Sequence, residues 1–300
     1  ARQTRIAQGK AGISRDGHNL YPAFPYTSFA GMAEDDLFAL YAHLQTLPAV
    51  AQPTPKAQMS VPRPALAAWN ALFHRPQSLA PDPAQGADWN RGRYLVETVG
   101  HCSECHTPRT ALGAQAKTPL SGAMVRDWFA PALAGPDAQL RGTDDIAAYL
   151  STGVAPGRAA ASGPMAEVIA GLSTLPDGDI TAMATYLASL PTDAPAPLPE
   201  QAATIPDRID RIFANACASC HEAALPDLLT AAQIPLTRAP AIRAPSPAAA
   251  QATIRDGLRA PTGTALRDMP AFGADLAEAD ILALARYLRA RYAPDLPGWD

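Results

Sequence analysis

Long apolar runs and a surplus of basic residues are both lacking from this chain of 300 residues. No stretch approaches the ~20 consecutive apolar residues that a membrane-spanning helix needs, which argues against a span within the chain. Acidic residues number 28 and basic residues 24, for a formal net charge of −4. Since a nucleic-acid-binding surface needs excess positive charge, no nucleic acid is expected as a partner.

Aromatic residues are scarce too, at 6%, although 48% of the residues are hydrophobic, so much of the apolar content is Ala and Leu. The 31 prolines exceed the average usage of about 5% and cluster at 191–199 and 235–247, which is typical of boundaries between modules. At ~150 residues per domain, the length favours about two domains.

Cysteine is absent outside two short motifs, at 102–106 and 217–221, which both read C-x-x-C-H. This is the attachment motif of c-type haem. The two thiols lie one helical turn apart and can add to the two haem vinyl groups, and the adjacent histidine supplies the proximal iron ligand. The residues predicted to bind haem in this way are Cys102, Cys105 and His106, and Cys217, Cys220 and His221.

Two other uses of cysteine pairs fit less well. Structural zinc sites usually hold their pairs ~12–20 residues apart, whereas these pairs begin at residues 102 and 217. A thioredoxin-type redox pair needs a βαβ setting, and none is visible. The motifs therefore predict two haem c groups on this chain.

A nine-residue pattern occurs three times, at 36–44, 179–187 and 280–288. Each copy begins with Asp, follows another acidic residue two positions earlier, and continues with apolar residues at helical spacing. Acidic residues in a first turn favour a helix N-terminus. Three copies in matching register indicate three copies of one module, each of which ends in this helix.

The haem motifs agree with this repeat. Cys102 lies 80 residues before Ala182, and Cys217 lies 66 residues before Ala283, at the same repeat position. The same interval places the motif of the first copy upstream of Ala1. We therefore expect residues 1–60 to form the C-terminal part of a first cytochrome c domain plus a linker.

A methionine stands ahead of the repeat helix in the other two modules. Met165 and Met269 precede their repeat alanines by 17 and 14 residues, so they occupy nearly equivalent places. A lone methionine is usually core packing, but the matched position favours a distal iron ligand, and His/Met ligation suits electron transfer. The first module has no methionine at these offsets, and His18 is the other candidate nearby.

Helical patterns surround both motifs, from Trp89 to about Gly100, and near 177–190, 207–216 and 278–292. In each module the first helix (the opening helix) and the last helix (the closing helix) would cross over a haem edge and make a small all-α fold. We expect one domain at 61–196, with haem at Cys102 and Cys105, and one at 197–300, with haem at Cys217 and Cys220.

The two motifs with late methionines resemble class I cytochrome c domains, so the predicted fold is all-α with tandem class I cytochrome c domains. Over nearly its whole length the chain is similar to the triple-haem cytochrome c subunit of periplasmic, membrane-associated bacterial dehydrogenases. The matching phrases lie at 17–26, 69–73, 89–95 and 100–109.

This resemblance implies a third haem in the full-length protein and a large catalytic dehydrogenase subunit of quinoprotein, flavoprotein or molybdopterin type. Phrases at 21–26, 70–74 and 297–300 favour the molybdopterin-linked group. A small iron–sulfur or other subunit, and membrane quinone or a terminal oxidase as acceptor, are further partners that it implies. Many relatives carry Met where Phe24 stands here, which leaves the sixth ligand of the first haem open.

The predicted function is electron transfer, with no catalytic residue on this chain, at the periplasmic outer face of the inner membrane. One alternative is a di-haem cytochrome c peroxidase-like enzyme, but such an enzyme needs one haem with an open coordination site. The other is a free, soluble shuttle cytochrome. Arg93 and Arg109 flank the first motif and are candidates to pair with a haem propionate, the alternative being ordinary surface charge.

Overall fold

The computed structural model describes residues 9–53, 61–135, 138, 142–156, 158–192, 207–222, 236–262, 264 and 266–299. In these residues the fold is helical apart from one two-stranded antiparallel sheet, which agrees with the predicted all-α class. No helix in the described ranges is long and apolar enough to cross a membrane.

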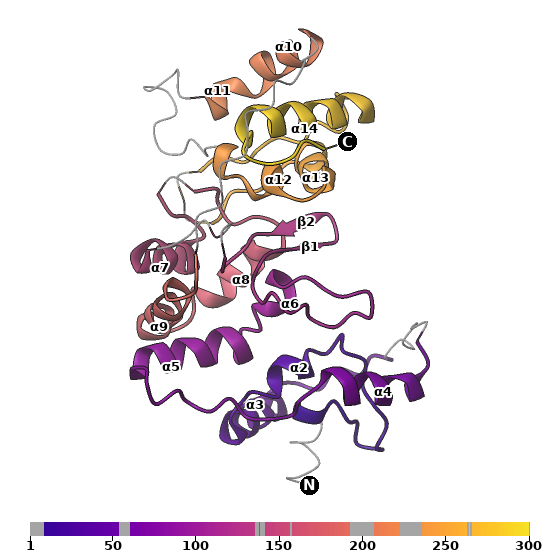
Figure 1. Cartoon of the computed structure of the whole chain (residues 1–300), viewed down its shortest axis with the longest axis vertical. Coiled ribbons are helices and arrows are strands. Elements are labelled where there is room, and N and C mark those ends of the chain that lie inside the picture. The colour runs from indigo at the N-terminus through magenta and orange to yellow at the C-terminus, as the bar shows by residue number, and fades with distance from the viewer. Residues whose placement is uncertain are drawn as a thin grey trace.

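The elements form three groups that follow one another along the longest axis of the molecule (Figure 1). The first group consists of α2 (Tyr26–Phe29), α3 (Glu34–Thr46) and α4 (Arg63–Phe73). The second consists of α5 (Ala87–Tyr94), the π-helix η1 (Leu95–Val99), α6 (Ser103–His106), β1 (Ala123–Val125), β2 (Trp128–Ala130), α7 (Thr143–Thr152), α8 (Pro164–Leu172) and α9 (Asp177–Ala188). The third consists of α10 (Asp207–Ala216), α11 (Ala218–His221), the 3₁₀-helix η2 (Leu236–Arg238), α12 (Pro240–Arg243), α13 (Ala248–Asp256) and α14 (Glu278–Tyr292).

The second group is centred on the crossing of α5 and α9. An ideal Cβ at Gly92 would lie 1.9 Å from the Ala182 carbonyl oxygen, so only glycine allows the two backbones to approach this closely. Trp89 packs edge-on against Tyr186, with ring centroids 5.1 Å apart. Arg91 donates two hydrogen bonds of 2.8 Å to the Asp179 carboxylate. The predicted opening and closing helices therefore pack directly on each other.

The third group repeats this arrangement. Phe213 of α10 is buried against Tyr287 of α14, with ring centroids 5.2 Å apart. Arg208 donates two hydrogen bonds to Asp280, the counterpart of Asp179 in the repeat. The predicted helices at 207–216 and 278–292 match α10 and α14 residue for residue. The same pair of helices, joined by the same Arg–Asp contact, thus occurs twice.

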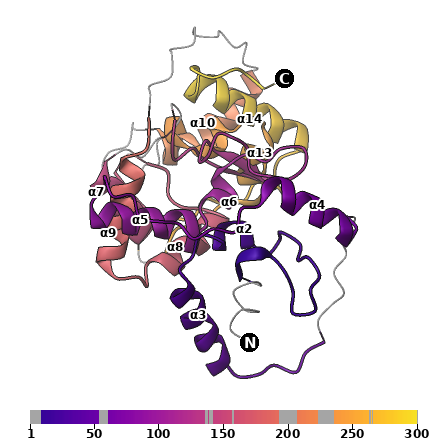
Figure 2. The ribbon, with the colours of Figure 1, turned by 60° about the horizontal axis from the view of Figure 1, so that its bottom comes forward.

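The first group is packed differently. Tyr26 is fully buried and donates a 2.7 Å hydrogen bond to Asn70 of α4. His74 lies edge-on to Tyr26 and is bonded at 2.7 Å to the Lys10 carbonyl oxygen. The α3 helix, by contrast, buries no residue against the described part of the chain and extends away from it (Figure 2).

Replacing Gly92 with alanine is expected to destabilise the protein, because the new methyl group meets a backbone carbonyl that cannot move without separating α5 from α9. Overpacking of this kind costs about 1–3 kcal/mol, which exceeds the helix-propensity gain of about 1 kcal/mol from Gly to Ala. The measurement is the midpoint of denaturant unfolding. Gly178→Ala in α9 is the matched control, since nothing lies within 4 Å of its Cβ position, and it should not lower the midpoint. An equal response of the two variants would contradict the prediction.

Candidate haem-binding site

The first motif is carried by the short helix α6, which begins directly after Cys102. The amide of His106 donates a 3.0 Å hydrogen bond to the Cys102 carbonyl, and this single turn places Cys102 and Cys105 on adjacent levels. All four cysteines lie in described segments and are free thiols. Burial raises the pKa of Cys102 to about 11, and that of Cys217 to about 11 as well. Both thiols are therefore protonated at neutral pH in the unmodified chain.

His106 is held in one orientation and one tautomer. Its Nδ1 lies 2.7 Å from the Pro131 carbonyl oxygen. A carbonyl only accepts, so Nδ1 carries the proton and the Nε2 lone pair remains for a metal. His106 is 8% exposed, and burial lowers the pKa of its imidazole, which keeps the ring neutral. This is the state that ligation of iron requires.

The structure brings most of the predicted ligands to one place. A largely apolar cavity of about 340 Å³ is lined by Cys102, Cys105, His106 and Met165, and also by Cys217, His221 and Met269. Cys220, which is exposed, is the one predicted haem-binding residue that does not belong to this lining. Thiols, neutral imidazole and thioethers around apolar walls are the groups that c-type haem needs, so the residues fit that cofactor.

The zinc alternative and the sixth ligand of a first haem concern other residues. The described residues contain no group of three or more His, Cys, Asp or Glu side chains that could hold a metal ion. In the first module, Phe24 packs on Phe29, and His18 Nδ1 lies 2.9 Å from Ser14 Oγ. Neither Phe24 nor His18 lines the cavity within the described residues. Neither residue is therefore assigned as the sixth ligand of a first haem.

Arg93 and Arg109 do not reach the described cavity walls. Arg93 forms an ion pair with Glu97 at 3.3 Å, and Arg109 pairs with Glu104. Four other arginines contribute positive charge to the described lining of the cavity: Arg158, Arg238, Arg259 and Arg267. Arg259 and Arg267 lie within ten residues of Met269. In the sequence, Arg259 and Arg267 could have been found by their closeness to the predicted distal ligand, whereas the prediction used closeness to the C-x-x-C-H motif.

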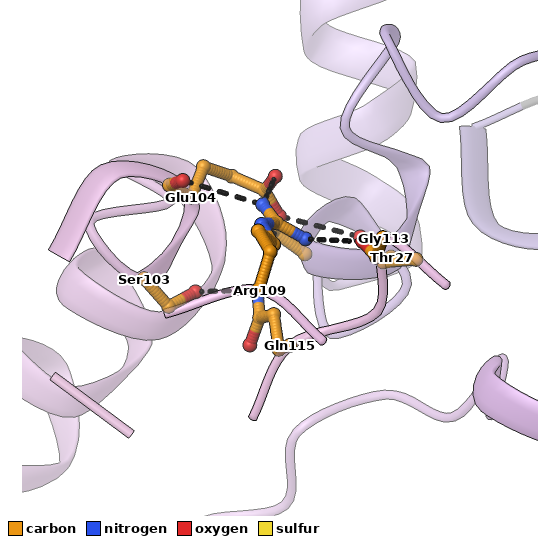
Figure 3. Close-up of polar contacts among 7 residues, drawn as sticks. Thr27, Ser103, Glu104, Arg109, Gly113 and Gln115 are labelled. Atoms are coloured by element: carbon orange, nitrogen blue, oxygen red, sulfur yellow. Dashed lines mark hydrogen bonds and ion pairs between the residues drawn. The ribbon is translucent and has the colours of Figure 1, made fainter. Parts of the chain in front are cut away.

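Glu104, between the two cysteines of the first motif, connects this site to the first group of elements (Figure 3). Its Oε1 accepts hydrogen bonds from Ser28 Oγ at 2.9 Å and Thr27 Oγ1 at 3.3 Å, and its Oε2 is paired with Arg109. Gln115 also donates to Oε1, at 3.2 Å. Hydrogen bonds to Glu104 therefore connect the first C-x-x-C-H motif to α2.

A double-mutant cycle on Ser28→Ala and Glu104→Gln measures this connection. Because the two side chains share a hydrogen bond to a mostly buried carboxylate, we expect a coupling energy of about 0.5–3 kcal/mol in the free energy of unfolding. Ser121→Ala is the control partner for Glu104, since Ser121 Oγ donates only to the nearby Thr118 carbonyl among the contacts of the described residues. A Ser28–Glu104 coupling no larger than the Ser121–Glu104 coupling would show that the connection contributes nothing to stability.

Known cytochromes and dehydrogenase subunits are similar to this chain. Residues 205–288 match the family described as "Cytochrome C oxidase, cbb3-type, subunit III". The chain is 38% identical to a nicotinate dehydrogenase subunit of Pseudomonas putida, over 97% of this chain and 25% of that protein. It is 40% identical to the fructose dehydrogenase cytochrome subunit of Gluconobacter japonicus, over 61% of this chain and 40% of that subunit. It resembles the cytochrome c subunits of dehydrogenases.

The predicted resemblance is thereby confirmed. A third relative, described as "Diheme cytochrome c-type" from Cereibacter sphaeroides, is 37% identical over 60% of this chain and 62% of its own length. The chain thus spans from a quarter to somewhat under two thirds of the length of these relatives. The family match and the relatives support haem c as the cofactor.

Proposed function

We propose that this chain is an electron-transfer cytochrome c subunit that receives electrons from a partner dehydrogenase. The observation that carries the proposal is that the histidines of both C-x-x-C-H motifs and the two matched methionines line one apolar cavity. When bound, c-type haem supplies an iron that gains and loses one electron. The similarity to cytochrome subunits of dehydrogenases supports the same function.

The chain's own residues have distinct roles in this proposal. Cys102, Cys105, Cys217 and Cys220 form the thioether bonds, His106 and His221 are the proximal ligands, and Met165 and Met269 are the distal ligands. The apolar walls exclude water, which stabilises the reduced state and raises the potential. Methionine on both distal sides leaves no open coordination site, and this argues against a peroxidase.

We also propose that the second and third groups are tandem class I cytochrome c domains. Each has its own buried cluster, with Ile180 and Met183 in one and Ile281 and Leu284 in the other. Contacts of α4 and Leu79 with residues 10–31 support a domain boundary after residue 79, later than residue 60. The boundary near residues 196–197 lies outside the described residues.

The exposed α3 helix supports a third haem module. It carries the first copy of the repeat, yet Leu40 and Leu44 are 44% and 50% exposed, whereas Met183 and Leu187 on α9 are buried. An apolar helix face of this kind needs an opposing helix. In the other two copies that opposing helix leads into a C-x-x-C-H motif, so we propose that a haem-bearing segment upstream of residue 1 covers α3.

The haem content of matured protein tests the proposal. The pyridine haemochrome assay should give two haems for the chain of 300 residues and one for the double variant Cys102→Ala/Cys105→Ala. Ser103→Ala, in the same motif but without a thiol, should retain two. A colourless wild-type protein would overturn the proposed function.

For the partner, we propose a dehydrogenase of the nicotinate type, which fits the molybdopterin-linked group favoured by the sequence. The similarity to the nicotinate dehydrogenase subunit extends over 97% of this chain, including the first group of elements. A periplasmic site at the outer face of the inner membrane, and membrane quinone or a terminal oxidase as acceptor, belong to the same proposal. Co-purification with a large catalytic subunit, and reduction of the chain by nicotinate only in its presence, would support it. Isolation of the chain alone from its native host, with no large subunit bound, would count against it and favour a soluble shuttle.

A further inference from the structure

The β1–β2 hairpin belongs to the second group in sequence, but its side chains contact both the second and the third group. Its strands pair Met124 with Phe129 and Val125 with Trp128. Since neighbouring residues of a strand point to opposite faces, each of these pairs occupies one face of the hairpin. The two faces make different contacts.

Met124 and Phe129 face the third group. Both pack against its hydrophobic core, which contains Ile242, Ala250 and Ile254. In Figure 1 the hairpin accordingly lies between the second group and the helices α12 and α13. The pKa of Arg255 in α13 is raised chiefly by its hydrogen bonds to Glu278, and the charge of Asp127 in the hairpin turn adds to that effect.

Trp128 faces the distal side of the second haem site. An ideal Cβ at Gly163 would lie 2.5 Å from the indole ring, so the ring packs on the backbone that leads into Met165. Val125 and Trp128 both line the cavity, and so does Phe129, whereas Met124 packs on the third core without belonging to the described lining. The hairpin therefore lies between the haem site of the second group and the core of the third group, and it contacts both.

The base of the hairpin is bonded to the proximal ligand at both ends. Ahead of β1, the Gly122 amide donates a 2.8 Å hydrogen bond to the His106 carbonyl. After β2, the Pro131 carbonyl accepts the 2.7 Å bond of His106 Nδ1. The hairpin is thereby joined to His106 by two hydrogen bonds, one on the backbone and one on the imidazole.

We propose that Met124 and Phe129 are positioning residues that lock the third module to the second and fix the spacing of the two haem sites within their shared cavity. The inference rests on the proposed function. It adds that the hairpin, and not a haem ligand, sets the position of one site relative to the other. The hydrogen bonds between the hairpin and His106 couple the position of this ligand to the position of the third module. Electron transfer between two cofactors depends on how the fold positions them, so this placement bears directly on function.

Phe129→Ala in the matured, full chain tests this inference by circular dichroism of the haem Soret band. Two haems at a fixed short spacing give a bisignate couplet, and we expect the couplet to be lost in Phe129→Ala while two haems remain attached. Phe129→Leu, which keeps an apolar side chain in the third core, should restore it. Leu276→Ala is the control for truncation against that core: Leu276 packs on the same core but lies outside the hairpin, so the couplet should persist. Because Phe129 also lines the cavity and Met124 does not, the couplet should be lost in Met124→Ala as well.

A second measurement keeps the test informative if Phe129→Ala folds poorly. In Met124→Ala, the smaller truncation, the reduction potential assigned to the haem at Cys102 and Cys105 should shift, since the hairpin bonds to His106. An intact couplet and an unshifted potential in folded variants would overturn the inference and leave the proposed function standing. Absence of haem from wild-type protein would overturn the function itself, so the two failures are distinguishable.

Discussion

Met165→Leu and Met269→Leu will each remove about half of the weak far-red absorption of ferric protein that arises from sulfur–iron charge transfer. Each will also lower the reduction potential of one haem, because the thioether ligand favours ferrous iron. Leucine has nearly the volume of methionine, and such exchanges in a core usually cost less than about 1.5 kcal/mol. The measurements are absorption spectroscopy and a spectroelectrochemical titration of the holoprotein.

Met32→Leu is the matched control for these variants. Met32 is buried, at 4% exposure, whereas Met165 and Met269 are half-buried, and Met32 lies in the first group of elements, outside the described lining of the cavity. Its replacement should leave both the far-red band and the potentials unchanged. If Met165→Leu behaves like Met32→Leu, Met165 is core packing and the second haem site has another distal ligand.

Gly257→Ala will destabilise the third group and weaken the far-red band of the same haem that Met269→Leu affects. Gly257 has φ +70°, and an ideal Cβ there would lie 2.5 Å from the Met269 carbonyl oxygen. The two adjacent chain segments are joined by hydrogen bonds between Leu258 and Met269 in both directions, of 3.0 and 2.9 Å. Because strain and a backbone clash act together, the expected loss is about 2–4 kcal/mol in the free energy of unfolding.

Gly113→Ala separates the two contributions. Gly113 has a similar φ of +77°, but nothing lies within 4 Å of its Cβ position. It should therefore show the strain alone, about 1 kcal/mol, with no change in the far-red band. Equal losses for the two glycine variants, or an unchanged band in Gly257→Ala, would show that the Met269 segment tolerates the added methyl group.

Much of the architecture follows from local patterns. The bounds of α10 and α14 agree with the predicted helices because acidic first turns and apolar spacing act within a few residues. The predicted opening helix of the second module is present at 87–99, but its second half is π-helical. Such a widened turn has no signature in the spacing of apolar residues and was not expected.

The haem prediction rests on features that can be read along the chain: the C-x-x-C-H spacing, the matched Met165 and Met269, and the repeat that relates the modules. These features are spacings along the sequence, so they can be recognised before the chain is folded. Three features required the folded chain: the set of arginines that line the cavity, the orientation of His106 by Pro131, and the packing of Phe129 against the core of the next module. Those contacts join segments that lie far apart in sequence, where packing and not local preference selects the partner.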